Sequence, residues 1–258
     1  MIGRKRVEYL RLFQGCMTDA GITEAPTITR DAATAVRYAE TGQGPDMLAS
    51  VRDRWYASLD NGEPDFGVYD DFLVAAFDCW WQYPRRYLND AAKPGSVFDH
   101  LNINGAVYDV GCGIGFTTAA LAELLPHCSV IGTELDSPTR RVAEALAAIP
   151  GFPSFTMEDQ VTQKADLLFA SEYFEHFQAP IDHLRELLSV VDPRVVIVAS
   201  TFTKPAIGHF PEYRTDQGTT TGAATSRAFN AALRSAGFGR LDTKLWNNRP
   251  AYWVRIPS

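Results

Sequence analysis

The stretch Ala106-Val-Tyr-Asp-Val-Gly-Cys-Gly-Ile-Gly115 and the apolar run that follows it, Phe116 to Leu125, decide the fold of this chain. Val107, Tyr108 and Val110 predict a buried strand, the closely spaced glycines a tight turn, and the apolar run a helix. Because glycine has no Cβ, the backbone N–H groups of such a turn can approach a ligand closely, together with the start of the helix. We therefore expect a small polar ligand at this turn.

The glycine turn departs from the dinucleotide-binding pattern G-x-G-x-x-G. Its third glycine, Gly115, stands one position early, and Phe116 occupies the place where that pattern has glycine or alanine. A bulky ring there would prevent the close packing of helix on strand that dinucleotide-binding domains need. This departure disfavours a nicotinamide oxidoreductase.

Two carboxylates accompany the turn. Asp109 lies inside the first strand, where burial is costly unless a cation or an N–H group, such as a ligand's ammonium group, is its partner. Glu134 follows the next predicted strand, Ser129–Thr133, where it can accept hydrogen bonds from both hydroxyls of a ribose. Together they predict a nucleoside that carries an amino-acid tail.

This arrangement resembles the first motif, (D/E)-x-G-x-G-x-G, of the class I S-adenosylmethionine-dependent methyltransferases, and the resemblance extends from about Phe98 to the C-terminus. It implies S-adenosylmethionine as the cofactor, with its methionine part at the turn, its ribose on Glu134 and its adenine against Leu135. After the third strand it implies a carboxylate that accepts from the adenine amino group, and we choose Asp159 over Glu158. The expected cofactor-binding residues are Asp109, Gly111, Cys112, Gly113, Gly115, Glu134, Leu135, Asp159 and Glu172.

After residue 95 predicted strands and helices alternate, which implies a parallel sheet covered on both faces. The last two predicted strands, Arg240–Trp246 and Ala251–Ile256, are joined by so short a turn that they must be antiparallel. Such a terminal hairpin distinguishes class I methyltransferases from nicotinamide-binding Rossmann domains. The expected fold is therefore α/β, with a Rossmann-like, seven-stranded, mostly parallel sheet and an antiparallel C-terminal hairpin.

Residues 1–95 are predicted to be helical and to form a cap, and residues 96–258 to form the cofactor-binding core. The strongest amphipathic run of the cap, Tyr69 to Tyr87, is rich in aromatic residues. Such a run is usually part of a core. The resemblance adds a second interpretation, in which cap helices close the cofactor site and build the acceptor pocket. The long segment Thr201–Ala224 is expected to be a loop that carries specificity.

Candidate catalytic residues follow the fourth and fifth strands. Ser171-Glu-Tyr-Phe-Glu-His-Phe177 resembles the E-x-x-E-H segment of the small-molecule methyltransferases, in which Glu172 faces the cofactor. His176 is there a general base or a structural residue. In the long loop, His209 and Tyr213 either orient or deprotonate an acceptor, or fix the loop in place. The implied reaction is an in-line displacement at the sulfonium methyl, which requires no metal, and we assign the carboxylates to the cofactor.

Composition limits the remaining functions. The 258-residue chain carries a net charge of −7, which argues against broad binding to phosphate backbones, and its four cysteines lack C-x-x-C spacing. No zinc site or disulfide framework is expected. No run reaches the length of a membrane span, and Glu8 and Arg11 interrupt the N-terminal segment where a signal peptide would be apolar. Reduced thiols and a cytoplasmic location, with no membrane association, are the simplest expectation.

Three functions stay open from the residues. The first is a methyltransferase that acts on an oxygen, nitrogen or carbon of a small molecule. The second is a methyltransferase of a nucleotide or nucleic acid, which the charge and the ending of strand four, Ser171-Glu-Tyr-Phe174, disfavour and which Arg85 and Arg86 keep open. The third is a non-catalytic partner that binds the cofactor. The sequence indicates no oligomeric state.

Overall fold

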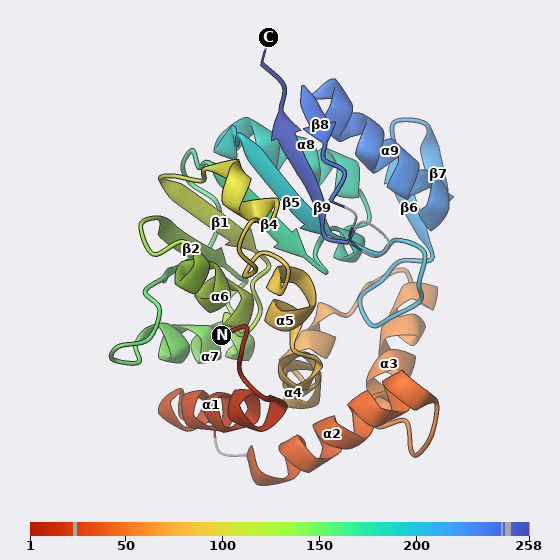
Figure 1. The fold of residues 1–258 in the computed structure, drawn as a ribbon. Helices are drawn as coiled ribbons and strands as arrows, with labels where there is room; N and C mark the ends of the chain where they lie inside the picture. The colour runs from red at the N-terminus through yellow and green to blue at the C-terminus, as the bar shows by residue number, and fades with distance from the viewer. Residues whose placement is uncertain (23–24, 244, 246–248, 258) are drawn as a thin grey trace.

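The computed structural model describes residues 1–22, 25–243, 245 and 249–257. Its centre is a seven-stranded sheet in the order β3-β2-β1-β4-β5-β9-β8 (Figure 1). The strands of this sheet are β1 Ala106–Val110, β2 Ser129–Thr133, β3 Thr156–Glu158, β4 Leu167–Ser171, β5 Val195–Ala199, β8 Phe238–Arg240 and β9 Ala251–Arg255. The helices of this half are α6 Phe116–Leu124, α7 Pro138–Ala147, α8 Pro180–Val191 and α9 Gly222–Ser235.

The sheet is parallel from β3 to β5, and β9 is antiparallel to both of its neighbours, β5 and β8. The expected fold is therefore confirmed, including the antiparallel end of the sheet. β1 and β2 have the predicted bounds because their apolar runs stop at the glycine turn and at Glu134. The boundary residues of the terminal hairpin differ, since β8 begins and ends earlier than the predicted Arg240–Trp246. Trp246 and the predicted turn residues Asn247 and Asn248 lie outside the described residues.

The sequence also predicts a brief third strand over Ser154–Thr156, which is two residues too early. β3 starts at Thr156, which pairs with Ile131 of β2, so Glu158 ends the strand and does not follow it. Phe155, just before the strand, is buried in the core instead.

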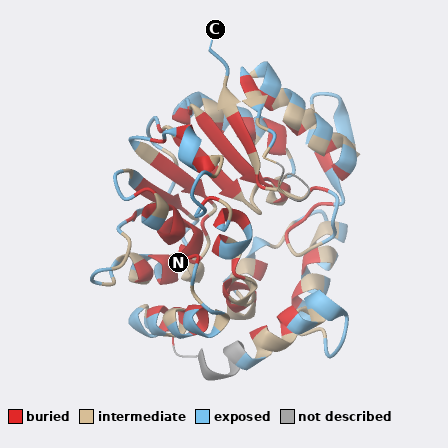
Figure 2. Ribbon diagram, viewed as in Figure 1, coloured by how far each residue is buried: buried red, intermediate tan, exposed pale blue. Residues whose placement is uncertain are grey.

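Two layers of helices cover the two faces of the sheet, because alternate strand residues point to opposite sides. Val107 of β1 joins the core on the side of α6 and α7, and its neighbour Tyr108 joins the core on the side of α8 and α9. Figure 2 shows the central strands buried along most of their length and the outer faces of the helices exposed. No helix among the described residues has the length and hydrophobicity to cross a membrane.

The first 95 residues are helical, as expected, and lie along one side of the molecule (Figure 1). Their helices are α1 Arg6–Asp19, α2 Ala25–Thr41, α3 Ala49–Asp60, α4 Phe72–Trp81 and α5 Tyr83–Leu88, with a short 3₁₀ helix at Phe66–Asp70. A second 3₁₀ helix, Phe98–Leu101, leads into the sheet. The single amphipathic helix predicted over Tyr69–Tyr87 was wrong. It is divided at Gln82, whose φ is 60°, because Pro84 has no N–H group to continue α4.

The helical segment and the sheet share one continuous core. Tyr9 of α1 packs against Phe116, the first residue of α6, with ring centroids 5.3 Å apart. Phe13 and Cys16 of α1 belong to the same buried cluster as Leu121 of α6. Phe116 thus contacts the helical segment at the place where a dinucleotide-binding domain has a small residue. The division into a cap of residues 1–95 and a core of residues 96–258 stays a prediction.

The segment Thr201–Ala224, predicted as a loop, contains a β-hairpin. Its strands are β6 Glu212–Thr215 and β7 Gly218–Thr221, which pair outside the main sheet. Tyr213 is the buried residue of β6. The sequence predicts a helix over Thr225–Ala236 after this segment, and α9 begins three residues earlier, at Gly222. A Cβ at Gly222 would lie 1.8 Å from the carbonyl oxygen of Phe202, so only glycine fits where the hairpin meets the helix.

Candidate cofactor and acceptor site

The glycine turn has the backbone shape that its sequence requires. Gly111, Gly113 and Gly115 all have positive φ values, 64°, 56° and 78°, which residues with a side chain rarely adopt. A Cβ at Gly113 would meet no atom within 4 Å, so the middle of the turn faces open space. At Gly111 a Cβ would lie 2.2 Å from the ring of Tyr173. The turn is therefore open at Gly113 and covered by Tyr173 at Gly111.

Asp109 is completely buried beneath this turn. Its Oδ2 accepts a hydrogen bond from Thr118 Oγ1 at 2.7 Å, and its Oδ1 has no partner. Burial raises the pKa of Asp109 to about 7, and the bond from Thr118 opposes that rise. A buried carboxylate oxygen without a partner is costly. The predicted ammonium group of a ligand would satisfy it.

Glu134 closes the turn from the β2 side. Its Oε2 accepts from the Gly113 N–H at 2.8 Å and its Oε1 from the Leu135 N–H at 2.9 Å. Burial raises the pKa of this carboxyl, and the two N–H donors lower it. Each carboxylate oxygen has a second lone pair and can still accept a hydrogen bond from a ligand. Glu134, which we assign to the ribose, lies between the open turn and the end of β2.

The expected adenine side is a pocket of about 430 Å³ at the end of β3. Glu158 accepts from Tyr108 Oη at 3.0 Å and from Thr162 Oγ1 at 3.1 Å, so its carboxylate is held by the protein itself. The side chain of Asp159 is 84% exposed and pairs with Arg140. Both carboxylates line the pocket, and the exposed one fits the choice of Asp159 over Glu158.

Two more predicted cofactor residues are Leu135 and Cys112. Leu135 is 74% exposed, which for a large apolar side chain fits a surface that a flat ring could cover. Cys112 is buried, and its Sγ lies 3.9 Å from Sδ of Met157, which lines the pocket. The Cys112 side chain thus packs behind Met157, a residue of the pocket wall.

Glu172 directly follows β4, which lies on the other side of β1 from β2. It has a φ of 48°, in the region that favours glycine, and its N–H donates to the Ala199 carbonyl at 2.8 Å. Its Oε1 accepts from Tyr87 Oη and from the guanidinium of Arg249. Burial and the neighbouring Glu175 raise the pKa of Glu172 to about 7, and Arg249 opposes the rise. A strained backbone with a buried charge is typical of functional sites.

The side chains of Glu175 and His209 lie beside Glu172. Glu175 is fully buried, and its Oε1 accepts from the Thr201 N–H at 2.8 Å. His209 Nδ1 lies 2.8 Å from the carbonyl oxygen of Lys204, so Nδ1 carries the proton and Nε2 is left with a free lone pair. Burial and the nearby His176 lower the pKa of His209 to about 4. This histidine is neutral at neutral pH.

His176 lies next to the same group, with its ring centroid 5.0 Å from that of His209. Its Nδ1 is 2.5 Å from Tyr69 Oη, a hydroxyl from the helical segment. Burial lowers the pKa of His176 below its usual range. The structure therefore brings together Glu172, His176 and His209, three of the predicted site residues, under side chains of the helical segment.

Tyr213 occupies a different place. It is completely buried on β6, between Phe202 and Phe210, and its hydroxyl donates to the Glu175 carbonyl at 3.2 Å. This favours the second of the two interpretations given above, in which the tyrosine fixes the segment in place. Its role in catalysis stays untested.

The sequence interpretation missed Arg249. A signal for it existed, because β9 is antiparallel to β5 and Ala251 pairs with Val198. The beginning of an antiparallel strand therefore lies at the carboxyl edge of its parallel neighbours, beside the ends of β4 and β5. The arginine of Asn247-Asn-Arg-Pro250, just before β9, stands at that edge in the sequence.

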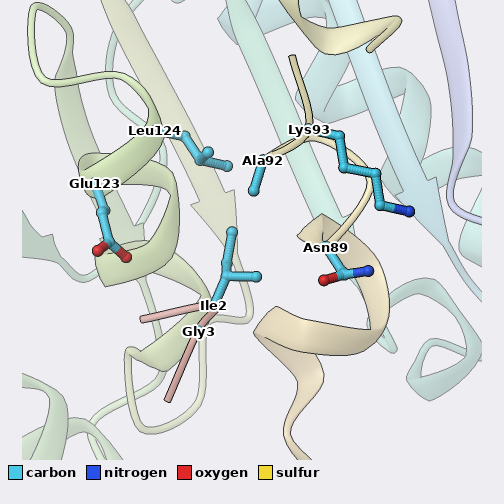
Figure 3. Close-up of a pocket in the computed structure, with 7 residues that line it drawn as sticks. All are labelled: Ile2, Gly3, Asn89, Ala92, Lys93, Glu123 and Leu124. Carbon is cyan, nitrogen blue, oxygen red and sulfur yellow. The ribbon is translucent and has the colours of Figure 1, made fainter. Parts of the chain in front are cut away.

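A second pocket, of about 440 Å³, lies elsewhere (Figure 3). Its walls include Ile2, Asn89 and Lys93, together with Glu123 and Leu124. The last two stand in the final turn of α6, at the opposite end of that helix from the glycine turn. This pocket takes no part in the site described above.

The strand order, the glycine turn after β1 and the carboxylates that end β1 and β2 place the protein in the class of Rossmann-like nucleoside-binding α/β proteins. Residues 108–197, from β1 to β5, match the family described as Methyltransferase domain. This segment carries the glycine turn and both carboxylates, and its match agrees with the class I S-adenosylmethionine-dependent methyltransferases that the motif resembles, with S-adenosylmethionine as the cofactor. The partnerless oxygen of Asp109 and the open space at Gly113 fit such a cofactor.

Two solved structures share this fold. One is the S-adenosylmethionine-dependent methyltransferase SibL in its apo form, at 17% identity and a TM-score of 0.51, covering 94% of this chain and 77% of that one. The other is the mitomycin 7-O-methyltransferase MmcR, at 15% identity and a TM-score of 0.51, covering 87% of this chain and 66% of that one. No curated protein sequence matches the chain.

Proposed function

We propose that this protein transfers the methyl group of S-adenosylmethionine to a small-molecule nucleophile held between the strand ends and the helical segment. One observation carries the proposal. Tyr87 and Tyr69, from the helical segment, hydrogen-bond to Glu172 and His176, the polar groups that follow β4. The acceptor side of the site is therefore covered by helices, which suits an enclosed small acceptor better than a long polymer.

The chain's own residues have three tasks in this function. Asp109 and the glycine turn would hold the methionine part of the cofactor, Glu134 its ribose and Asp159 its adenine. When bound, the cofactor supplies an activated methyl group on a sulfonium. Since the methyl group is already activated, the main work of the protein is to align the two reactants and to exclude water.

The polar groups after β4 and β5 would orient the acceptor and take up its proton. His176 and His209 are neutral at neutral pH because burial lowers both pKa values, so each can accept a proton. Nδ1 of His209 is committed to the Lys204 carbonyl, which leaves Nε2 as the reactive nitrogen. Nδ1 of His176 is similarly committed to Tyr69.

The charge of the chain supports the choice of acceptor. The net charge of −7 gives no general attraction for phosphate backbones. The mitomycin methyltransferase that shares the fold is named for a small-molecule acceptor. Both observations favour a small molecule over RNA or DNA.

Cofactor binding is tested by thermal unfolding with S-adenosylhomocysteine. At about 100 times Kd, a ligand specific for the folded state adds about 2.7 kcal/mol, roughly 5–10 °C for a domain of this size. We expect Glu134→Ala to lose most of this shift. Glu186→Ala, on α8 where the side chain is 77% exposed, should keep it. An equal shift in the Glu134 variant would reject the ribose assignment.

Transfer is tested with S-adenosylmethionine labelled in its methyl group and a cell extract separated by molecular mass. We expect label in the low-mass fraction, and none with Asp109→Asn. Label in precipitated RNA or DNA would overturn the proposed acceptor class. Tight cofactor binding without transfer to any fraction would identify a non-catalytic partner.

A further inference from the structure

A cluster of three side chains at the ends of β4 and β5 has the composition of a metal site. Glu172, Glu175 and His209 each offer one ligand atom, two carboxylate oxygens and one imidazole nitrogen. These atoms all lie within 4.8 Å of one another. Glu175 is fully buried and His209 is 6% exposed. Buried carboxylates this close together repel each other unless a cation or a proton lies between them.

An independent observation is an oxygen without a partner. Glu175 Oε1 accepts from the Thr201 N–H, and Oε2 of the same side chain is buried with no hydrogen bond. Leaving a carboxylate oxygen buried and unpaired costs more than a hydrogen bond contributes when formed. This oxygen therefore points to a ligand with positive charge.

The orientation of His209 is a third observation. Its Nδ1 donates to the Lys204 carbonyl at 2.8 Å, so the ring is fixed and the lone pair of Nε2 is available. Metal-binding histidines generally donate their second ring N–H in this way, which sets the tautomer and raises the basicity of the ligand atom. The histidine is thus prepared as a neutral ligand.

Arg249 does not satisfy the whole cluster. Its guanidinium contacts Oε1 of Glu172, which also accepts from Tyr87. One guanidinium balances one carboxylate, and Glu175 has no ion pair among the described residues. One guanidinium thus leaves the second of the two carboxylates without a cation.

We propose that Glu172, Glu175 and His209 bind a divalent first-row transition ion. The mixed nitrogen and oxygen donors suit Mn²⁺, Fe²⁺, Co²⁺ or Zn²⁺ better than Mg²⁺ or Ca²⁺, which favour oxygen alone. The expectation from the sequence was the opposite, since the carboxylates were assigned to the cofactor and no metal was called for. With His209 as a ligand, His176 is the remaining candidate base. The site does not depend on the proposed methyl transfer.

The test is a titration of chelator-treated protein with Mn²⁺, followed by the loss of the electron paramagnetic resonance signal of the free ion and carried out without cofactor. We expect one ion per chain. Glu175→Gln and His209→Asn should each weaken binding at least tenfold. Both variants are chosen so that the amide side chain can still make the contact to Thr201 or Lys204.

The control is Glu186→Gln, a carboxyl on α8 that is outside the three ligands and whose side chain is 77% exposed. It should bind Mn²⁺ within twofold of the unaltered chain. The proposal would be overturned if the two ligand variants bound Mn²⁺ as tightly as the control variant. It would also be overturned if the unaltered chain bound no Mn²⁺ at millimolar concentration.

A second measurement needs no variant. The pulsed resonance spectrum of the Mn²⁺ complex should show nitrogen coupling from a single imidazole. A spectrum without nitrogen coupling would contradict the proposal even if the Glu175 and His209 variants failed to fold.

Discussion

The two halves of the site, at the carboxyl ends of β1 and β2 and of β4 and β5, are held together by different kinds of contact. On the β1–β2 side, Asp109 and Glu134 are held by nearby chain, by Thr118 at nine residues' distance and by the N–H groups of Gly113 and Leu135. On the β4–β5 side, Glu172 is held by Tyr87 and Arg249, 85 and 77 residues away in sequence. Local contacts make a site that sequence can predict, whereas remote contacts make one that only the fold assembles.

The two sides also differ in how charge is balanced. Backbone N–H groups, which cannot titrate, hold the carboxylate on the cofactor side at Glu134. On the acceptor side a guanidinium and a phenol hold Glu172. Substitutions on the cofactor side should therefore destabilise the fold by straining the backbone. Substitutions on the acceptor side should destabilise it by leaving a charge without a partner.

The largest expected effect of this difference is at the glycine turn. Gly111→Ala places a Cβ 2.2 Å from the Tyr173 ring at a φ of 64°, and should destabilise the fold by about 2–4 kcal/mol. Gly113→Ala has a similar φ of 56° but no neighbour within 4 Å, and should cost only about 1 kcal/mol. Urea unfolding of both variants measures this. Equal losses would show that contact with Tyr173 does not matter.

The next effect belongs to the acceptor side. Arg249→Ala removes the cation that pairs with the partly buried Glu172, and should destabilise the fold by about 1–3 kcal/mol at pH 8. Adding Glu172→Gln should recover part of that loss, because the unpaired charge is then gone. A double variant no more stable than Arg249→Ala would show that the ion pair is not the cause. Urea unfolding again gives the values.

The smallest expected effect is a pH dependence on the cofactor side. The pKa of Asp109 is raised to about 7 in the fold, so its contribution to stability is complete below the unfolded pKa near 4. That contribution is lost as pH rises through 7. Asp109→Asn should flatten the decline between about pH 4 and 7 and be more stable than the unaltered chain at pH 8, by on the order of 1 kcal/mol or more. Parallel pH profiles would contradict the assigned burial cost.

The sequence predicted the elements whose signals are local. β1 and β2 have the expected bounds because apolar runs end at Gly111 and Glu134. The break at Gln82, the hairpin of β6 and β7, and the late start of β3 were missed. Each depends on which partner a backbone group finds across the fold, and pattern alone does not specify that partner.

The site divides in the same way. Asp109, Glu134 and the glycine turn lie together as the motif predicted. The predicted histidines do meet Glu172, but Tyr69, Tyr87 and Arg249 complete their surroundings from distant parts of the chain. Tyr213 shows the limit of motif reading, because its neighbours in sequence belong to the loop while its side chain is part of the core.

The contact between Phe116 and Tyr9 has a practical consequence. Every residue of α6 from Phe116 to Ala122 is buried, and α1 supplies part of that cover. A shortened protein that begins near Gly95 would leave this helix with a bare apolar flank directly after the glycine turn. Such a fragment should associate with itself in water, and laboratories that express this protein will need its first helix.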